Sequence, residues 1–554
     1  MEKLWSITVG NLLSEIAEKF PNDNAVNYTD RDYKRTWKEF NEEVERIAKG
    51  FLSIGVKKGD HVAIWATNTP EWLLTLFATA KIGAVLVTVN TNYKVFELEY
   101  LLRQSDTKFL VMNAGFKDSD YIKIVNELCP TLKDNKPNEF SSTALPCLKS
   151  VIIASDETPA GMMNFKELYH AIDESIEKEY AEIVESLDPH DVINMQYTSG
   201  TTGFPKGVML THFNIVNNGK CIGDNMKFTH QDKLCITVPF FHCFGLVLAI
   251  MACITHGTAM VPIDSFSPTK VMDALQNEDC TAVHGVPTMF IAMLENPAFK
   301  GYKFTHLRTG IMAGSPCPIK VMQQVVDEMG MHDITICYGQ TEASPVCTQT
   351  NIDDSLELRV STVGRVMQGV EAKIVNPETG ETCPPHVPGE FCARGYNIMK
   401  GYYKMEEATL QAIDEDGWLH TGDLAIVDEN GYYKITGRIK DMIIRGGENI
   451  YPKEIEEFLY TVENVKDVQV IGIPSKIYGE EIMACVILKA GATMTEQEIK
   501  DAVKANMARH KVPSHVAFVE SFPMNAAGKI MKYKMREWAI EHLNLQDAAS
   551  IVTA

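Results

Sequence analysis

The feature that most constrains the fold is an alternation of short β-branched runs with helical patterns through the first two-thirds of the chain. Residues 61–66 have the pattern of a strand, residues 72–80 that of an amphipathic helix, and residues 84–89 that of a strand buried on both faces. Strand–helix–strand order at this spacing favours right-handed crossovers in a parallel sheet. Further strands are predicted at residues 108–112, 261–263 and 282–286, the last followed by a helix from Pro287. The sequence therefore predicts an α/β fold.

The pattern changes after Glu390. Shorter strands in hairpins are predicted near residues 401–403, 431–437 and 467–473, and helices at residues 452–462 and 495–507. A chain of 554 residues exceeds the usual limit of one hydrophobic core, so at least two domains are expected. We predict a domain of residues 1–437, a connecting segment of residues 438–441 and a small α+β domain of residues 442–554.

The charge balance excludes one class of partner. Lys and Arg total 52 against 73 Asp and Glu, which gives a formal net charge of −21. Binding to a nucleic-acid backbone needs a basic excess to displace counterions, so no nucleic acid is expected. Small anionic ligands stay allowed, because a phosphate needs only a local nest of N–H groups and one or two cations.

Cysteine usage and the chain ends predict a cytoplasmic protein. The 13 cysteines form no CxxC pair and no Cys/His grouping at metal-ligand spacing, which is typical of reduced thiols. We see no cleavable hydrophobic region at the start and no retention or peroxisomal signal at residues 552–554. Residues 234–263 carry no charge, but their strongly apolar part, residues 244–254, is too short to span a bilayer. We expect a buried core helix there and no integral membrane segment.

The strongest local motif runs from Tyr197 to Gly207, Tyr-Thr-Ser-Gly-Thr-Thr-Gly-Phe-Pro-Lys-Gly, after an apolar strand pattern. Glycines let backbone N–H groups turn inward, hydroxyls add donors and Lys206 adds a positive charge, which together make a polyphosphate cradle. A Walker A loop is excluded, because Pro205 precedes the lysine and Gly207 follows it where Ser or Thr should bind Mg²⁺. A solvated surface loop is the alternative for this run taken alone.

The loop is accompanied by other motifs. They are Pro-Phe-Phe-His at 239–242, Gly-Ser-Pro at 314–316, Tyr-Gly-Gln-Thr-Glu at 338–342, Trp-Leu-His-Thr-Gly-Asp at 418–423, Gly-Arg-Ile-Lys-Asp at 437–441, Arg-Gly-Gly-Glu-Asn at 445–449 and Pro-Met-Asn-Ala-Ala-Gly-Lys at 523–529. In kind and order these motifs resemble the adenylate-forming superfamily of AMP-binding enzymes, and they cover most of the chain. The run at 440–452 is similar to short- and medium-chain acyl-CoA synthetases of the type called acyl-CoA synthetase family member 2.

The resemblance implies a fold and an activity. The fold is a large N-terminal adenylate-forming domain with layered α/β sheets and a small, mobile C-terminal α+β domain. The activity is that of an acid–thiol ligase, which converts a short- or medium-chain fatty or aryl monocarboxylic acid to acyl-AMP with release of pyrophosphate and then transfers the acyl group to CoA. ATP, Mg²⁺ and CoA are the implied co-substrates and metal.

The resemblance also implies roles for single residues. Thr341 would donate to the α-phosphate, Tyr338 would stack on the adenine, and Asp423 with Arg438 would bind the ribose. Glu342 would hold Mg²⁺, a hard cation that prefers oxygen ligands. The ATP- and AMP-binding set is Thr198, Ser199, Gly200, Thr201, Thr202, Gly203, Pro205, Lys206, Gly314, Ser315, Tyr338, Thr341, Asp423, Arg438 and Lys529.

The resemblance also implies which residues serve formation of acyl-AMP and which serve transfer of the acyl group to CoA. Lys529, Thr341 and His242 are the implied catalytic residues, with Lys529 bridging the α-phosphate and the attacking carboxylate. Asn525 stands where the family commonly has Thr, and both side chains can cap a turn. Lys440 is the implied hinge, and Arg445, Gly446 and Gly447 would face the CoA tunnel. His242 either gates the tunnel or acyl pocket or is a core histidine, and His420 receives no role.

The acyl pocket is predicted to be apolar. Acetate-specific relatives have a tryptophan at the place of Gly339, so glycine would let a longer chain enter. The implied walls are Phe241, Phe244, Val286 and Ala313, with His284 and Met289 beside them. Since none of these side chains is Arg or Lys, a monocarboxylic acid is favoured over a dicarboxylic one.

Three other readings share these motifs. An enzyme that loads a carrier protein would carry an insertion near the hinge, whereas Asp441 runs directly into residues 442–447. Luciferase-like oxidation uses the same motifs. A non-catalytic acyl-adenylate sensor could dispense with Lys529 or Glu342, yet both are present. A homodimer is compatible with the sequence, and no basic amphipathic helix supports membrane association.

Overall fold

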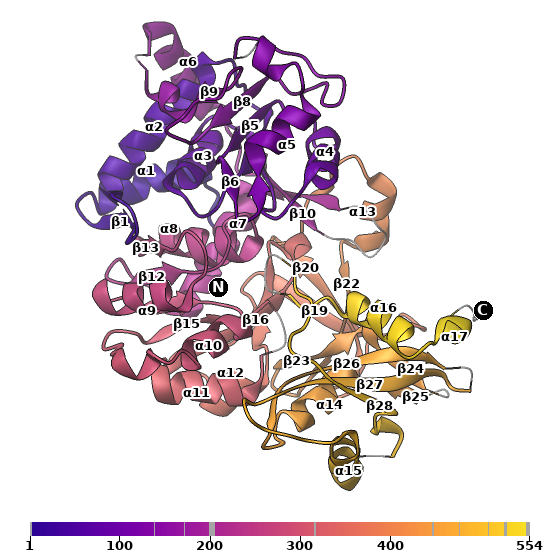
Figure 1. The fold of residues 1–554 in the computed structure, drawn as a ribbon. Helices are drawn as coiled ribbons and strands as arrows, with labels where there is room; N and C mark the ends of the chain where they lie inside the picture. The colour runs from indigo at the N-terminus through magenta and orange to yellow at the C-terminus, as the bar shows by residue number, and fades with distance from the viewer. Residues whose placement is uncertain are drawn as a thin grey trace.

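The structure is a computed structural model that describes residues 3–549, except residues 138, 171, 199–204, 315–316, 446–447, 476, 508 and 526–528. Two large sheets and two smaller ones form its frame. Figure 1 shows the two large sheets, coloured indigo to pink, one above the other, with the orange and yellow C-terminal elements beside the lower one. The α/β class predicted from the sequence is confirmed.

The upper, eight-stranded sheet contains the predicted strand–helix–strand unit. Its strand order is β21 (Gly401–Tyr402), β11 (Lys206–Thr211), β10 (Val192–Thr198), β4 (Val85–Thr88), β3 (His61–Trp65), β5 (Phe109–Met112), β8 (Ser150–Ile153) and β9 (Met163–Asn164). Strands β3, β4 and β5 are parallel, and Val62 lies opposite both Leu86 and Phe109. The crossover helix α3 (Pro70–Lys81) begins at a proline, which lacks the N–H that a first turn leaves unpaired. Because α3 is covered by α1 (Val9–Lys19) and α2 (Trp37–Ser53), nearly all its residues are buried.

The lower, nine-stranded sheet has a parallel centre. Its order is β18 (Arg365–Val366), β17 (Val346–Gln349), β16 (Asp333–Gly339), β15 (Thr309–Met312), β14 (Ala282–His284), β12 (Lys233–Ile236), β13 (Ala259–Pro262), β1 (Asn24–Asn27) and β2 (Lys34–Thr36). The uncharged stretch forms β12, the π-helical segment η3 (Phe244–Met251), α8 (Ala252–His256) and β13. Every residue of η3 is buried, as predicted. Among the described residues, no helix is both long and apolar enough to cross a membrane.

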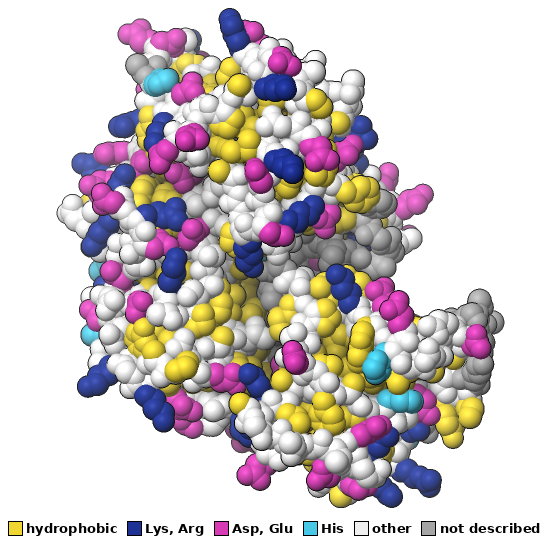
Figure 2. Space-filling model, viewed as in Figure 1, with side chains coloured by type: hydrophobic (Ala, Val, Ile, Leu, Met, Phe, Trp, Pro, Cys, Tyr) yellow, Lys and Arg dark blue, Asp and Glu magenta, His cyan; other side chains and the backbone are white. Residues whose placement is uncertain are grey.

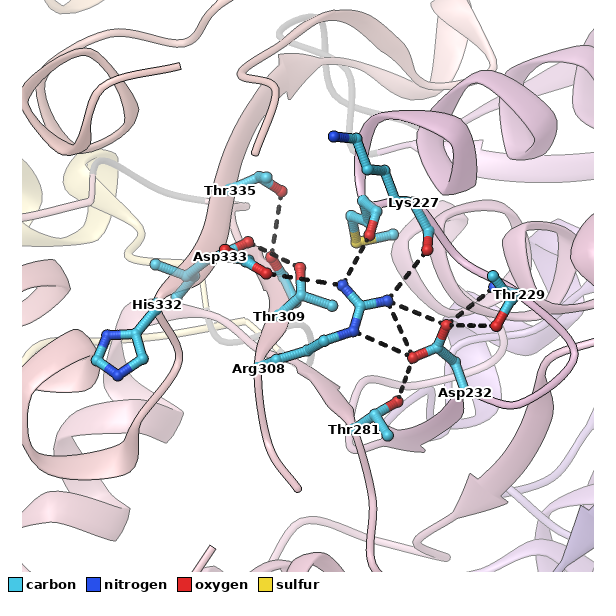
Figure 3. A network of polar contacts seen from close by, with 12 residues as sticks. Lys227, Thr229, Asp232, Thr281, Arg308, Thr309, His332, Asp333 and Thr335 are labelled. Carbon is cyan, nitrogen blue, oxygen red and sulfur yellow. Dashed lines mark hydrogen bonds and ion pairs between the residues drawn. The ribbon is translucent and has the colours of Figure 1, made fainter. Parts of the chain in front are cut away.

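An ion pair between a buried aspartate and a partly exposed arginine fixes the amino ends of the parallel strands (Figure 3). Arg308, just before β15, donates through Nη2 to both carboxylate oxygens of Asp232, at 2.9 and 3.0 Å. Asp232 precedes β12 and also accepts from the hydroxyl of Thr281, which precedes β14, at 2.8 Å. The same guanidinium donates to the carbonyl oxygens of Met226 and Lys227. The opposite, carboxyl ends of these strands are therefore left for ligands, where open α/β sheets bind them.

The remaining strands form a small hairpin, β6 (Gly115–Phe116) with β7 (Ser119–Asp120), and two further sheets made mostly of antiparallel pairs. The four-stranded sheet is β19 (Val370–Val375), β20 (Gly389–Gly395), β22 (Leu419–Val427) and β23 (Tyr433–Arg438). The five-stranded sheet is β25 (Glu448–Ile450), β24 (Ile443–Arg445), β27 (Gly479–Leu488) and β26 (Val465–Ser475), with β28 (His515–Phe518) paired to β27. The strand predicted from Gly401 is not part of a hairpin. It pairs instead with β11 of the eight-stranded sheet.

Helices pack against these sheets, and some of them lie between the two large ones. The remaining ones are α4 (Val95–Gln104), α5 (Tyr121–Leu128), α6 (Glu174–Glu185), α7 (His212–Asn225), α9 (Pro268–Asn277), α10 (Pro287–Leu294), α11 (Ile319–Met329), α12 (Leu356–Ser361), α13 (Glu406–Ala412), α14 (Pro452–Leu459), α15 (Glu496–Asn506), α16 (Lys532–His542) and α17 (Gln546–Ala549). The predicted helix from Pro452 ends three residues early, because the chain must turn before β26 begins at Val465. The helix predicted at residues 495–507 is confirmed as α15, with a capping box at Thr495.

The hydrophobic core is divided. Three clusters of buried residues involve only residues before 436, and two involve only residues after 442. The predicted domain limits stay a prediction, and this division of the core agrees with them. On the face shown in Figure 2, Lys and Arg are interspersed with Asp and Glu.

Candidate active site

The predicted phosphate cradle lies between two paired strands. β10 leads into it and β11 leads away, and the two strands pair with Thr198 opposite Lys206. The hydroxyl oxygen of Thr198 is buried and has no hydrogen-bond partner among the described residues. A buried hydroxyl without a partner is costly, and an oxygen-rich ligand would satisfy it. The carbonyl of Pro205 accepts from Tyr100 at 3.0 Å, whereas Ser199, Gly200, Thr201, Thr202 and Gly203 lie outside the described residues.

Tyr402 links this cradle to the predicted metal ligand. The ammonium of Lys206 lies 4.4 Å from the centroid of the Tyr402 ring. The hydroxyl of the same ring donates to Oε1 of Glu342 at 2.8 Å. Glu342 lies in the short helical turn η5 (Thr341–Ala343), which follows β16 at the carboxyl end of the parallel strands. One lysine and one carboxylate, predicted from separate motifs, are thus neighbours.

A second group of polar side chains lies at the carboxyl end of β16. Tyr338 donates through its hydroxyl to Oδ2 of Asp423 at 2.9 Å, and Arg438 contacts Oδ1 of Asp423 at 2.8 Å. Asp423 is almost fully buried, and burial together with this carboxylate raises the pKa of Tyr338 well above its usual value. The predicted adenine- and ribose-binding residues therefore meet around one carboxylate.

Asp423 follows an irregularity in β22. Glu390 of β20 accepts from the backbone N–H of Gly422 at 2.9 Å, and its other oxygen contacts His420 Nδ1 at 2.8 Å. Gly422 has φ +69°, which a side chain would disfavour, so glycine permits the kink. Glu390, Cys392 and His420 also form the group of potential metal ligands found among the described residues. Their contacts with one another, and that of His420 with Asp414, satisfy them without a metal.

Lys529 lies beside Asp423 and Arg438, although it comes from the C-terminal part of the chain. The charges of Asp423, Arg438, Lys440 and Asp441 all act on its ammonium group. Desolvation by protein atoms around the ammonium, followed by the positive charge of Arg438, lowers the pKa of Lys529 to about 8. The residue as a whole stays exposed, so the desolvation is local to the ammonium. The side chain of Asn525, which stands where the family commonly has Thr, accepts from the N–H of Lys529 at 2.9 Å.

His242 lies in the same region and is uncharged at neutral pH. Burial, followed by the positive charge of Lys529, lowers the pKa of His242 to about 4. Its Nδ1 accepts from the N–H of Phe244 at 3.2 Å, so the neutral ring carries its proton on Nε2. The adjacent Cys243 accepts from the hydroxyl of Thr341 at 3.6 Å. Thr341 is buried beside this thiol, one residue from Glu342.

The predicted acyl walls are all buried and apolar. Phe241, Phe244, Val286 and Ala313 are each less than a tenth exposed. A methyl group added at Gly314 would lie 3.1 Å from Val286 and 3.8 Å from Phe244, which places this glycine against the two side chains. His284, also expected near the pocket, is fully buried and contacts the Leu248 carbonyl and the Ile311 N–H. Ser315 lies outside the described residues.

Gly339 has a structural reason beyond pocket size. A Cβ at this position would lie 1.8 Å from the carbonyl oxygen of Pro345. The backbone of β16 therefore passes too close to the following turn for any side chain. In this conformation the glycine is required by backbone packing, and its effect on acyl length stays a prediction.

The residues predicted for the CoA step lie in the C-terminal part. Lys440 belongs to the short turn η6 (Ile439–Asp441) that follows β23. Arg445 forms an ion pair with Glu481 at 2.7 Å and donates to the His510 carbonyl at 2.9 Å. Both partners belong to the same C-terminal part of the chain. Gly446 and Gly447 lie outside the described residues.

Sequence reasoning missed two groups in this site. Tyr402 was predicted only as part of a strand, and the Glu390–His420 pair was not predicted at all. The signal for Tyr402 was an aromatic residue in a Gly-Tyr-Tyr run, which carries no chemistry until its strand partner is known. The pair was hidden because Glu390 belongs to none of the motifs and lies 30 residues before His420.

Comparison with protein families places the chain among known enzymes. A family model described as AMP-binding enzyme matches residues 13–403. A second, described as AMP-binding enzyme C-terminal domain, matches residues 454–529.

Similar proteins share nearly the whole chain. YngI of Bacillus subtilis (strain 168), which is named as an acyl-CoA synthetase, is 52% identical over 99% of this chain and 100% of its own length. The mitochondrial medium-chain acyl-CoA ligase ACSF2 of Rattus norvegicus is 40% identical over 97% of this chain and 88% of its own. Among solved structures, ATP-bound MatB from Rhodopseudomonas palustris superposes with a TM-score of 0.81 at 28% identity, covering 96% of this chain and 99% of MatB.

Proposed function

Since the chain belongs to the AMP-binding enzyme family and is an ATP-dependent acyl-CoA ligase, we propose that it activates a medium-chain monocarboxylic acid with Mg²⁺ at the residues described above. The observation that carries this proposal is that four charged residues from separate motifs meet near the carboxyl end of β16. Lys206 and Glu342 are joined through Tyr402, and Asp423, which accepts from Tyr338, acts on the ammonium of Lys529. Attack of one anion on another needs positive charge to stabilise the transition state, which Lys206, Lys529 and a metal held by Glu342 would supply.

In the first half-reaction an oxygen of the acid attacks the α-phosphorus of ATP. The bond from the α-phosphorus to the bridging oxygen breaks, and pyrophosphate leaves with the electron pair. Thr198 and Lys206 bind the β- and γ-phosphates, Thr341 donates to the α-phosphate, and Lys529 neutralises the charge that develops between phosphate and carboxylate. A bound Mg²⁺ would supply further positive charge at the phosphates.

Glu342 fits a magnesium ligand. Its side chain is half-buried, and its Oε1 accepts from the Tyr402 hydroxyl. The same Tyr402 ring contacts the ammonium of Lys206. Among the described residues no hydrogen-bond donor is found for the other carboxylate oxygen of Glu342, and this oxygen could bind a hard cation. Tyr338 with Gly314 would hold the adenine, while Asp423 and Arg438 would hold the ribose hydroxyls.

The acid is proposed from the chemistry of its walls. Phe241, Phe244, Val286 and Ala313 are apolar, so a second carboxylate would lose its hydration without gaining a partner. The name of the Rattus norvegicus relative supports a medium chain length. Burial of the apolar surface of such an acid on binding stabilises the complex by about 25 cal/mol per Å².

In the second half-reaction the sulfur of CoA attacks the acyl carbon. The bond from this carbon to the phosphate oxygen breaks, AMP leaves with the electron pair, and the thiol proton is released to solvent. We propose that residues 442–554 form a mobile domain that turns about Lys440, withdraws Lys529 and brings Arg445, Gly446 and Gly447 to the pantetheine. We also propose a cytoplasmic enzyme, and a homodimer that size-exclusion chromatography with light scattering would detect.

The test is ATP–pyrophosphate exchange with a panel of straight-chain and aromatic acids, followed by assay of acyl-CoA with CoA present. Exchange and thioester formation with medium-chain monocarboxylic acids would support the proposal. Activity restricted to acetate or to dicarboxylic acids would overturn the proposed acid. Exchange with no CoA product would favour loading of a carrier protein.

A further inference from the structure

Tyr402 reaches the site through an unusual connection. The segment between β20 and β22, two strands of the four-stranded sheet, crosses to the eight-stranded sheet and adds β21 at its edge. The helix that follows, α13, contacts both β21 of the eight-stranded sheet and β22 of the four-stranded sheet. In the pairing with β11, Tyr402 lies opposite Val208, and the N–H of Tyr403 donates to the Gly207 carbonyl at 2.8 Å. The register therefore brings Tyr402 next to the start of β11, where Lys206 lies.

The same segment holds the turn that carries Glu342. The N–H of Met399 donates to the carbonyl of Glu342 at 2.8 Å, and the hydroxyl of Ser344 donates to the carbonyl of Asn397 at 2.5 Å. The Tyr402 hydroxyl then holds the Glu342 side chain. Backbone and side chain of Glu342 are thus both fixed by residues 397–402.

The position of Tyr402 leaves its side chain little freedom. The residue is only 6% exposed, and its N–H donates to the hydroxyl of Thr409 in α13 at 2.9 Å. A buried phenol needs a hydrogen-bond partner, and here the partner is the Glu342 carboxylate. The ring face, which carries partial negative charge, lies near the Lys206 ammonium. One rigid side chain therefore contacts both a carboxylate and a cation of the site.

We propose that Tyr402 is a positioning residue that orients the Glu342 carboxylate and the Lys206 ammonium to receive a divalent metal with the ATP polyphosphate. The inference rests on the proposed function, in which Glu342 holds the metal and Lys206 the phosphates. Residues that orient a metal ligand typically change metal affinity about 10- to 100-fold when they are replaced.

The experiment compares Tyr402→Phe with Tyr403→Phe. The first keeps the ring and removes only the hydroxyl that contacts Glu342. The second removes a hydroxyl that also donates to a carboxylate, that of Asp106 at 2.8 Å, in a contact that involves none of the proposed site residues. Binding of Mn²⁺ in the presence of ATP is measured by electron paramagnetic resonance of the free ion. The Mg²⁺ dependence of ATP–pyrophosphate exchange is measured in parallel.

We expect Tyr402→Phe to weaken Mn²⁺ binding about tenfold and to raise the Mg²⁺ concentration for half-maximal exchange by a similar factor. Its kcat at saturating Mg²⁺ should change much less than this. Tyr402→Leu, which also removes the ring, should in addition raise the KM for ATP. A merely structural role would lower kcat and the melting temperature and leave metal affinity unchanged.

Equal Mn²⁺ affinities for Tyr402→Phe and Tyr403→Phe would overturn the inference. Glu342→Gln separates this failure from failure of the proposed function. If Glu342→Gln weakens Mn²⁺ binding and Tyr402→Phe does not, only the role of Tyr402 is wrong. If Glu342→Gln binds Mn²⁺ with ATP as tightly as the wild type, the metal assignment itself is wrong.

Discussion

The phenol of Tyr338 donates a hydrogen bond to Oδ2 of Asp423, and the two oxygens are 2.9 Å apart. This contact joins the end of β16 in the nine-stranded sheet to β22 in the four-stranded sheet. Nε of Arg438 forms an ion pair with the other carboxylate oxygen, Oδ1, at 2.8 Å. The nucleotide-binding residues proposed here are therefore oriented before any ligand arrives, which reduces the cost of ordering them on binding.

Asp423→Asn should weaken ATP binding. The amide keeps the size of the side chain but loses the negative charge, and only one of its two polar atoms can accept a hydrogen bond. The contacts with Arg438 and Tyr338 are therefore weakened, and hydrogen bonds to charged groups contribute about 1.5–3 kcal/mol each. We expect the KM for ATP in pyrophosphate exchange to rise at least about tenfold. Asp416→Asn, at an exposed position in the preceding turn, is the control and should leave the KM for ATP unchanged. Equal KM values for the two variants would contradict the role of Asp423.

Adenylation should decline at alkaline pH as Lys529 loses its proton. The pKa of Lys529 is lowered to about 8, so its charge is present below this pH and is lost as pH rises through it. The quantity kcat/KM for ATP reports groups of the free enzyme and should therefore fall above about pH 8. Lys529→Arg keeps its charge at every accessible pH. Whatever its absolute rate, this variant should lack the alkaline limb, and a limb of unchanged position would exclude Lys529 as its source.

The protein should lose stability in mild acid because of three buried neutral histidines. Burial lowers the pKa of His212 to about 3 and those of His242 and His284 to about 4, against 6.5 for an unperturbed imidazole. Between pH 6.5 and 4 the unfolded chain binds protons that the folded chain does not, so the free energy of unfolding falls as pH falls. Each histidine contributes up to about 1.4 kcal/mol per pH unit in this window.

His284→Gln tests this account, since the amide can both donate to Leu248 and accept from Ile311 as the imidazole does. Urea unfolding at pH 7.5, 6 and 5 should show a shallower decline for the variant than for the wild type. Parallel curves would show that His284 does not contribute to the acid dependence.

Asp232→Asn should destabilise the fold without altering substrate affinity. The substitution breaks the bidentate pair with Arg308 at the amino ends of the parallel strands, away from the site at their carboxyl ends. Removing one partner of a buried pair costs about 3 kcal/mol or more, and we expect the lower value because the Arg308 side chain is 31% exposed. Asp156→Asn, which breaks an exposed pair with Lys166, is the control and should change the free energy of unfolding little. A change in the KM for ATP in Asp232→Asn would contradict the separation of the two strand ends.

Local pattern predicted the parts of the fold that depend on neighbours in sequence. The unit of β3, α3 and β4 followed from apolar periodicity and from the spacing of the three elements, and the buried stretch around η3 followed from its length. The strand β21 was predicted, but its partner could not be assigned in this way, because β21 is only two residues long and pairs with a strand almost 200 residues earlier. Such pairing depends on tertiary packing and not on local propensity.

The site shows the same limit. Motif residues such as Lys206, Glu342 and Asp423 were identified from resemblance, and their neighbours were not. Tyr402 and Glu390 act through contacts with these residues, which only the folded chain brings together. Gly339 shows a further difference, since the sequence suggested an open acyl pocket and the backbone shows a close approach of Pro345.

The central claim is that one site performs adenylation and thioester formation, with Lys529 serving only the first. The most direct measurement compares Lys529→Ala with the wild type in two assays, ATP–pyrophosphate exchange with the acid and acyl-CoA formation from a supplied acyl-adenylate. We predict that the variant loses exchange by at least about 100-fold, as expected for loss of electrostatic stabilisation, and keeps thioester formation within a few-fold of the wild type. Loss of both activities in equal proportion, or exchange that survives the substitution, would contradict the account.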